Sequence, residues 1–346
     1  MSIILLGDTH FGASNSNPNL HDYMEKFYKD FFEYIDANNI KTIIQLGDLF
    51  DVRKHINTWS LAFFRQVFLK PVIERNLKVY VLVGNHDIYY RESLKISSVE
   101  EVLEPYADWF TIVNEPKDYV IEDHSFLLVP WVCKDNISTV QGAIERSSST
   151  FCAGHFEFNG FELFRGQLAK TNYTHESYSK FKKVFSGHFH HMSSRDNVLY
   201  TGTPYELTWQ DCNTTKGFYV LHSDESLELV ENQHTLFSSF ALSEQEIIPE
   251  SLVSQKHVRI RVDLPLEPKD RDRLLDRLYS MKPYSLKLVE KKVETEGSDE
   301  VTYAPTTSIT DLIGDYVNNI SIPETLEKDR LKSVLLGMLI EATNAN

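Results

Sequence analysis

The stretch VYVLVGNHD, residues 79–87, places five apolar residues before a glycine and the polar triplet Asn85, His86 and Asp87. A short apolar run closed by a glycine is typical of a buried strand that ends in a turn. A similar arrangement occurs four more times: Ile3–Leu6 before Gly7-Asp8-Thr9-His10, Ile43–Leu46 before Gly47-Asp48, Phe151–Ala153 before Gly154-His155, and Val184–Phe185 before Gly187-His188-Phe189-His190. Because open α/β sheets bind ligands outside the carboxyl ends of their strands, we expect an α/β fold with one shared site.

The side chains after these turns are potential metal ligands: Asp8, His10, Asp48, Asn85, His155, His188 and His190. Taken singly, Gly-Asp is usually a turn, Asp-x-His is a weak signal and paired histidines are common on surfaces. Together and in this order, they predict a two-metal phosphoesterase site. The mixed nitrogen and oxygen donors suit manganese, iron or zinc better than calcium, and the two oxygens of Asp48 could bridge two cations about 3.5–4 Å apart.

These motifs resemble, in the same order, those of the calcineurin-like metallophosphoesterases. Within them the chain is most similar to the SbcD nucleases, the family called meiotic recombination eleven in eukaryotes. Three stretches resemble most closely the recombination endonuclease subunits of T-even-type bacteriophages, namely residues 47–54 (GDLFDVRK), 130–133 (PWVC) and 154–161 (GHFEFNGF). The motifs cover roughly residues 1–210.

The resemblance implies a role for each candidate residue. One metal would be held by Asp8, His10, Asp48 and His190, and the other by Asp48, Asn85, His155 and His188. His86 corresponds to the general acid near the scissile phosphate, and Asp87 could orient it. Some cellular members have a histidine three residues after the bridging aspartate, where this chain has Asp51. The residue that takes the place of this second transition-state histidine is therefore open. The expected cofactors are two Mn²⁺ ions, with Mg²⁺ as a possible substitute.

The resemblance also implies a substrate and partners. The substrate would be double-stranded DNA, cut by exonuclease and endonuclease activity in recombination, repair or replication. The partner would be an SbcC-like ABC-type ATPase with a long coiled coil. This chain would form a homodimer, and the homodimer and the ATPase together would form a heterotetramer. The helical stretch from Trp59 to Ile73 carries enough aromatic surface to form that homodimer, although a buried core helix would look the same.

Composition sets further limits. The 346 residues, 42% of them hydrophobic, can form one large core and a smaller module. Only Ile3–Leu6 is apolar at the amino terminus, too short a run for a signal or membrane segment. Three widely spaced cysteines indicate neither disulfides nor a zinc ribbon. We therefore expect a soluble protein of the cytoplasm, that of the host cell if a phage encodes it.

A net charge of −15 is unusual for a DNA-binding protein. However, residues 256–292 hold eleven basic and six acidic side chains, which leaves a local charge of +5. This segment predicts contacts with DNA phosphates, although a merely solvated helix face has the same composition.

Periodicity predicts the organisation of the chain. A helix over Leu20–Ile35 crosses between the first two strands, and strands are expected at Val120–Pro130, Val198–Thr201 and Phe218–Leu221. The expected core is a two-layer β-sandwich flanked by helices, with a small α+β capping domain built from strand Val258–Val262, helix Asp270–Met281 and strand Tyr284–Val289. The predicted domains are 1–235 (nuclease), 236–293 (DNA cap), 294–307 (linker) and 308–346, a helix pair that binds the ATPase.

Two other classes of function stay open. A small-molecule or protein phosphatase could use the same dimetal core, but it would not need the basic module or the terminal helices. Phosphoprotein phosphatases of this superfamily also usually carry Gly-Asp-x-Val-Asp-Arg-Gly, whereas here Asp51 is followed by Val52-Arg53. A noncatalytic scaffold is the third class, and the complete ligand set argues against it.

Overall fold

A six-stranded mixed sheet contains the amino-terminal metal-motif strands. The structure, a computed structural model, describes residues 1–164 and 166–290 and the single residues 328 and 335. The sheet has the order β16-β15-β1-β2-β3-β6, in which β1, β2, β3 and β6 run parallel. Its strands are β1 (Ile3–Leu6), β2 (Thr42–Gln45), β3 (Lys78–Leu82), β6 (Phe110–Val113), β15 (Gly217–Leu221) and β16 (Leu227–Glu231).

A second six-stranded sheet contains the later motif strands, in the order β13-β14-β12-β9-β8-β7. Its strands are β7 (Lys117–Ile121), β8 (His124–Val129), β9 (Phe151–His155), β12 (Lys183–Gly187), β13 (Ser193–Arg195) and β14 (Val198–Tyr200). The four central strands are parallel, and β7 and β13 are antiparallel edge strands. The strand predicted over residues 120–130 is divided by a turn, where Glu122 has a φ of 51°.

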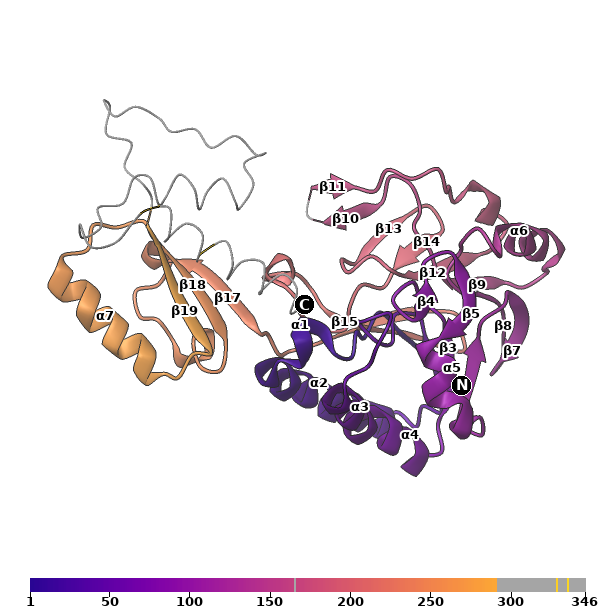
Figure 1. Cartoon of the computed structure of the whole chain (residues 1–346), viewed down its shortest axis with the longest axis horizontal. Helices are drawn as coiled ribbons and strands as arrows, with labels where there is room; N and C mark the ends of the chain where they lie inside the picture. The colour runs from indigo at the N-terminus through magenta and orange to yellow at the C-terminus, as the bar shows by residue number, and fades with distance from the viewer. Residues whose placement is uncertain (165, 291–327, 329–334, 336–346) are drawn as a thin grey trace. The chain divides into compact units, whose positions relative to one another are not determined.

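The two sheets share one apolar cluster, which joins Ile3, Leu5 and Ile44 of the first sheet to Phe126 and Phe185 of the second. Because neighbouring residues in a strand point to opposite faces, Ile4 and Ile43 pack instead against helices on the outer side. Leu127 and Val184 likewise pack against residues of α6 (Ile137–Arg146). The predicted α/β fold is therefore confirmed, and these clusters place the sheets face to face with helices outside (Figure 1).

Helix α2 (Pro18–Ala37) connects β1 to β2. It begins with Pro18, and the side chain of Asn17 accepts the Asn19 amide at 2.9 Å, which satisfies one free donor of the first turn. Its buried face supplies Tyr23, Phe27 and Phe31 to the core outside the first sheet. The next helix runs through α3 (Thr58–Phe64), a π-helical turn (Arg65–Leu69) and α4 (Lys70–Glu74).

That second helix is mostly a core helix. Phe63, Phe64 and Phe68 are buried, whereas Trp59 is 58% exposed. The aromatic surface expected to serve a homodimer is thus largely used inside the chain.

The remaining elements of the core are short. They are α1 (Ala13–Ser16), α5 (Ser98–Leu103), hairpin strands β4 (Ile88–Tyr90) and β5 (Ser93–Ser97), strands β10 (Glu162–Phe164) and β11 (Gln167–Leu168), and single 3-10 turns at Glu104–Tyr106, Glu176–Tyr178, Trp209–Asp211, Leu242–Glu244 and Glu250–Leu252. All three cysteines are buried and unpaired. Among the described residues, no helix is both long and apolar enough to cross a bilayer.

A small parallel sheet follows, made of β17 (Phe237–Ala241), β18 (His257–Val262) and β19 (Ser285–Glu290), with α7 (Pro268–Ser280) between the last two strands. Phe240, Ile260 and Leu278 belong to its core. The predicted β-α-β order is confirmed, and β17 is an additional strand. Residues Met1–Lys291 form one compact unit. The linker 294–307 and the helix pair 308–346 lie outside the described residues, apart from positions 328 and 335.

Candidate metal centre

The candidate ligands lie at the carboxyl ends of five strands. β1, β2 and β3 of the first sheet lead to Asp8 and His10, Asp48, and Asn85. β9 ends at His155, and β12 leads to His188 and His190. Because these strand ends face one another across the two sheets, all seven side chains lie in one region.

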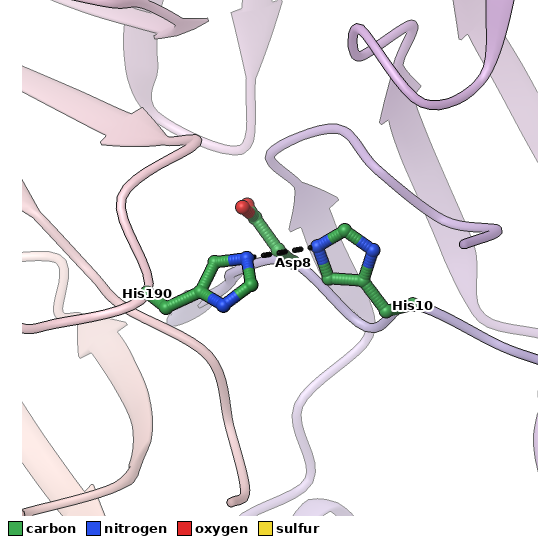
Figure 2. A group of neighbouring side chains, drawn as sticks. All are labelled: Asp8, His10 and His190. Atoms are coloured by element: carbon green, nitrogen blue, oxygen red, sulfur yellow. Dashed lines mark hydrogen bonds between the residues drawn. The ribbon is translucent and has the colours of Figure 1, made fainter. Parts of the chain in front are cut away.

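Asp8, His10 and His190 form a first group, with ligand atoms within 4.8 Å of one another (Figure 2). The Nε2 atoms of His10 and His190 are 3.1 Å apart and face each other. Two neutral imidazoles can hold this geometry only if one nitrogen carries a hydrogen. A cation placed between their lone pairs would satisfy both.

Asp48, His155 and His188 form a second group of the same size. The amide oxygen of Asn85 lies 2.9 Å from His155 Nε2 and 2.8 Å from His188 Nδ1. Asn85 therefore faces the same point as the two imidazoles, and its neutral oxygen can complete the donor set.

Asp48 lies between the two groups. Its Oδ2 is 3.3 Å from His155 Nε2 and 3.8 Å from His10 Nε2. Its Oδ1 accepts the backbone amide of His86 at 2.7 Å. One carboxylate thus reaches both ligand groups, as a bridging ligand must.

Contacts behind the ligands fix their orientation. His155 Nδ1 donates to the carbonyl of Leu46 at 2.7 Å, which leaves Nε2 for a metal. His10 Nδ1 lies 3.1 Å from a carboxylate oxygen of Asp51, which orients that ring in the same way. Such partners of ligating histidines fix the tautomer and raise the basicity of the ligand nitrogen.

The backbone at the ligands is unusual. His10, Asp48 and His188 have φ values of 43°, 53° and 84°, in a region that non-glycine residues seldom occupy and that is enriched at functional sites. Position 84 requires glycine, because a Cβ there would lie 2.2 Å from the backbone nitrogen of Asp48. Any side chain at position 84 would push the Asp48 loop away from its place.

The electrostatics of the group favour a cation. Burial opposes protonation of His10, but its hydrogen bond to Asp51 and the charge of Asp48 raise the pKa of His10 to about 9. Burial likewise opposes protonation of His155, yet Asp48 and Asp8 raise its pKa to about 9. Burial and the charge on His10 lower the pKa of His190 to about 3. Protons on two imidazoles therefore compensate the buried carboxylates when no metal is bound.

The pKa values of Asp8 and Asp48 depend on the same two opposing effects, burial and the charge of the neighbouring imidazoles. Burial raises the pKa of Asp8 to about 7 although His155 opposes this. Burial acts against ionisation of Asp48 as well, but His155 and His10 hold its pKa well below the ordinary value. A divalent cation would replace the imidazole protons, so the residues present fit a metal centre.

The three candidate catalytic side chains lie beside this centre. His86 Nδ1 contacts the carbonyl oxygen of Asp51 at 2.5 Å, and its ring lies edge-on to that of His10, with centroids 4.9 Å apart. A carbonyl only accepts, so Nδ1 carries the hydrogen and Nε2 is left for another partner.

Asp87 differs from its expected role. Its carboxylate accepts backbone amides from Gly84 at 2.9 Å, Phe50 at 3.1 Å and Leu49 at 3.2 Å. These bonds join the loop after β3 to the loop after β2. The side chain that orients His86 is therefore not that of Asp87, and the contact to the His86 ring comes from the backbone of Asp51.

Two further residues, Lys216 and Trp131, support the site. Trp131 lies in the stretch 130–133 that carries the family resemblance, whereas Lys216 has no signal in the sequence. Lys216 is buried, and its Nζ donates to the carbonyl of His190 at 2.8 Å, to Thr203 Oγ1 at 2.9 Å and to Asp211 Oδ1 at 2.6 Å. The ring of Trp131 lies 5.1 Å from that of His188 and 5.9 Å from that of His155, between centroids. A lysine before a strand is ordinarily exposed, so its burial could not be predicted.

Comparisons with known proteins agree with this geometry. Residues 1–192 match the family model described as calcineurin-like phosphoesterase. The chain is 30% identical over 335 residues to Exonuclease subunit 1 of Enterobacteria phage T4, an alignment that covers 95% of each chain. A solved glutamine-dependent NAD⁺ synthetase from Acinetobacter baumannii, in complex with adenosine diphosphate, aligns at 10% identity over 98% of this chain and 72% of that one. Its TM-score of 0.29 is too low to support any argument about the fold.

The family match spans more than half of the 346 residues and includes all seven candidate ligands. The phage relative extends the similarity over nearly the whole chain, which supports the resemblance expected from the sequence motifs. The chain therefore belongs to the calcineurin-like phosphoesterase family, whose members use divalent metals.

Proposed function

We propose that this chain is the nuclease subunit of an SbcCD-like complex and hydrolyses phosphodiester bonds of double-stranded DNA with two Mn²⁺ ions, for which Mg²⁺ can substitute. The observation that carries the proposal is the convergence of two ligand groups on Asp48. The exonuclease name of the phage relative favours a nuclease over a phosphatase on the same fold.

In this proposal the two ligand groups hold one ion each. Asp8, His10 and His190 would hold the first ion, Asn85, His155 and His188 would hold the second, and Asp48 would contribute to both. Bound there, divalent ions would supply Lewis-acid stabilisation of the negative charge that develops on the phosphate oxygens. The buried carbonyl of Leu46 and the carboxylate of Asp51 keep the ligand nitrogens turned toward the ions.

His86 is the proposed general acid. Its Nδ1 is occupied by the carbonyl of Asp51, so a proton or hydrogen bond for the leaving oxygen must come from Nε2. His86 is partly exposed whereas His10 and His155 are buried, so a substrate can reach it more readily. Asp51 both contacts His10 and positions His86, which gives it a supporting role where some relatives have a histidine.

DNA binding is assigned to the small module, residues 236–293. Lys269, Arg273 and Arg277 of α7 are exposed, in a chain whose overall charge is −15. Phosphate contacts from such residues would position a duplex without reading its sequence. Residues 308–346 are the proposed arm for an ABC-type ATPase, and a homodimer would use the exposed Trp59 and Ile96.

The decisive experiment is digestion of end-labelled duplex DNA with Mn²⁺, Mg²⁺ or chelator, with and without the ATPase partner. We expect cleavage that requires metal and is abolished by Asp48→Ala. Cleavage of phosphomonoesters but not of DNA would instead identify a phosphatase. Binding of DNA without any hydrolysis would identify a scaffold.

A further inference from the structure

A cavity of about 460 Å³ is lined in part by Trp131, whose ring lies against two of the candidate metal ligands, His155 and His188. Its wall includes Arg91, Trp131, Lys134, Glu157 and Tyr173. These residues come from the β4–β5 hairpin turn and from the segments after β8, β9 and β11, so the cavity is formed by loops at the same end of the second sheet as its ligands. Its volume is within the usual range for small-molecule sites, roughly 300–1,000 Å³.

Trp131 connects this cavity to the candidate ligands. Its ring lies against those of His188 and His155, with centroids 5.1 Å and 5.9 Å away. The backbone on both sides of the ring is fixed: the Trp131 amide donates to the carbonyl of Val83 at 2.7 Å, and the side chain of Asn136 donates to the Trp131 carbonyl at 2.9 Å. A group in the cavity and a phosphate at the metal centre would therefore be held next to each other.

Tyr173 provides a second fixed aromatic ring. It stacks on Phe158 at 5.5 Å between centroids and 12° between planes, and its hydroxyl is hydrogen-bonded to that of Tyr178. Two rings held in this way form a preorganised surface for a flat partner. Base–aromatic stacking accepts any base, because each has a π-face.

The polar lining suits the edge of a heterocycle better than another phosphate. Two cationic side chains, Arg91 and Lys134, are balanced by the carboxylates of Glu92 and Glu157. The Glu92 carboxylate also accepts the Lys134 amide at 3.3 Å. Carboxylates accept from the amino groups of bases, whereas they would repel a phosphate, and the basic side chains can donate to ring nitrogens and carbonyls.

We propose that this cavity binds an unpaired nucleobase of the substrate strand, from a nucleotide adjoining the phosphate at the metal centre. The proposal rests on the nuclease function above and deepens it: the site requires a strand whose base has left the duplex stack. Stacking on Trp131 and Tyr173 would offset part of the cost of unpairing.

The test uses the full chain with Mn²⁺ and end-labelled duplexes that carry a short single-stranded end. A single abasic site is placed on either side of one cleaved phosphate, and kcat/KM is compared with that of the unmodified strand. For the parent chain we expect the abasic site on the favoured side to lower kcat/KM by about tenfold, the loss of one stacked base. In Trp131→Ala that penalty should fall to about twofold or less.

Two more variants keep the test sound if Trp131→Ala loses metal through its contacts with His155 and His188. Tyr173→Leu and Glu157→Gln should also reduce the abasic penalty. Val120→Ala shortens an apolar side chain on β7 that is 78% exposed and does not line the cavity, so it should keep the full penalty. Metal content and thermal melting are measured for each variant.

The outcomes separate the two proposals. The assignment of the cavity is overturned if the parent chain shows no abasic penalty. It is also overturned if the penalty is equal in the parent and in all three cavity variants. Either result would hold even if the cavity bound a free nucleotide, because the proposal concerns a base of the substrate strand. Failure of the parent to cut either strand overturns the nuclease function and this inference with it.

Discussion

Replacing Lys216 by methionine tests whether a buried ion pair behind the ligands supports the metal centre. The Lys216 side chain is 3% exposed, and its ammonium group donates to three acceptors: the carbonyl of His190, the hydroxyl of Thr203 and the carboxylate of Asp211. Methionine keeps most of the volume but removes every donor. Asp211, 1% exposed, would then be a buried carboxylate without its cation.

The expected loss follows from these contacts. Breaking a buried ion pair by removing one partner costs about 3–5 kcal/mol, because the other charge stays buried. Asp211 retains the amides of Leu207 at 3.0 Å and Thr208 at 2.8 Å, which places the expected loss near the lower end, about 3 kcal/mol. The double variant Lys216→Met with Asp211→Asn should lose less than the single one, since no charge is left buried.

The assay is urea unfolding of the metal-free chain together with calorimetric Mn²⁺ binding. Loss of the anchor on the His190 carbonyl should weaken metal binding as well as folding. Lys182→Met is the matched control, because Lys182 pairs with Glu225 but is 60% exposed, and exposed pairs contribute about 0–1 kcal/mol. If Lys216→Met costs no more than Lys182→Met and binds Mn²⁺ like the parent, the buried pair does not support the site.

Four further predictions concern the centre and the partners. Asp48→Ala should lose both metals, whereas His86→Ala should retain them and cleave DNA about 10²–10⁴ times more slowly. Metal analysis and DNA digestion measure these two effects. Equal loss of metal in both variants would contradict the assigned roles. The pKa values of His10 and His155 are raised to about 9 in the metal-free chain, so Mn²⁺ binding should release their protons and should tighten as pH rises toward 9. Calorimetry in buffers of different ionisation enthalpy measures the number of protons released. An affinity for Mn²⁺ that does not change with pH would contradict this prediction. Replacement of Arg271, Arg273 and Arg277 by glutamate should weaken duplex binding for all sequences and flatten its salt dependence. An unchanged salt slope would mean that these side chains of α7 face solvent and do not contact DNA. Truncation after Pro305 should abolish co-purification with the ATPase and leave Mn²⁺-dependent phosphodiester cleavage intact, so retained binding or an unfolded chain would contradict the proposed arm.

The strands and the candidate ligands could be predicted because their signal is local. An apolar run, a glycine and a ligand residue lie within about ten positions, as in Val79–Asp87, and strand ends of an α/β sheet meet at one edge. Strand β17 gave no such signal, since Phe237–Ala241 contains two serines and no β-branched residue.

The supporting contacts could not be predicted because they join distant positions. Lys216 meets the carbonyl of His190 across 26 positions, and Asp87 meets the amide of Leu49 across 38. Nothing near Asp87 in the sequence distinguishes a carboxylate that orients His86 from one that accepts three backbone amides. Only the three-dimensional arrangement of the two loops decides between these roles.

The contacts behind the ligands also join the two sheets. The amide of His188, after β12, donates to both oxygens of Asp8, after β1, at 3.0 and 2.9 Å. His155, in β9, donates to the carbonyl of Leu46, after β2. Each bond connects a residue of one sheet with a residue of the other, so the spacing of the ligands depends on how the sheets pack. Metal binding and the face-to-face packing of the sheets should therefore stabilise each other, and a substitution in the shared apolar cluster, far from any ligand, should weaken both.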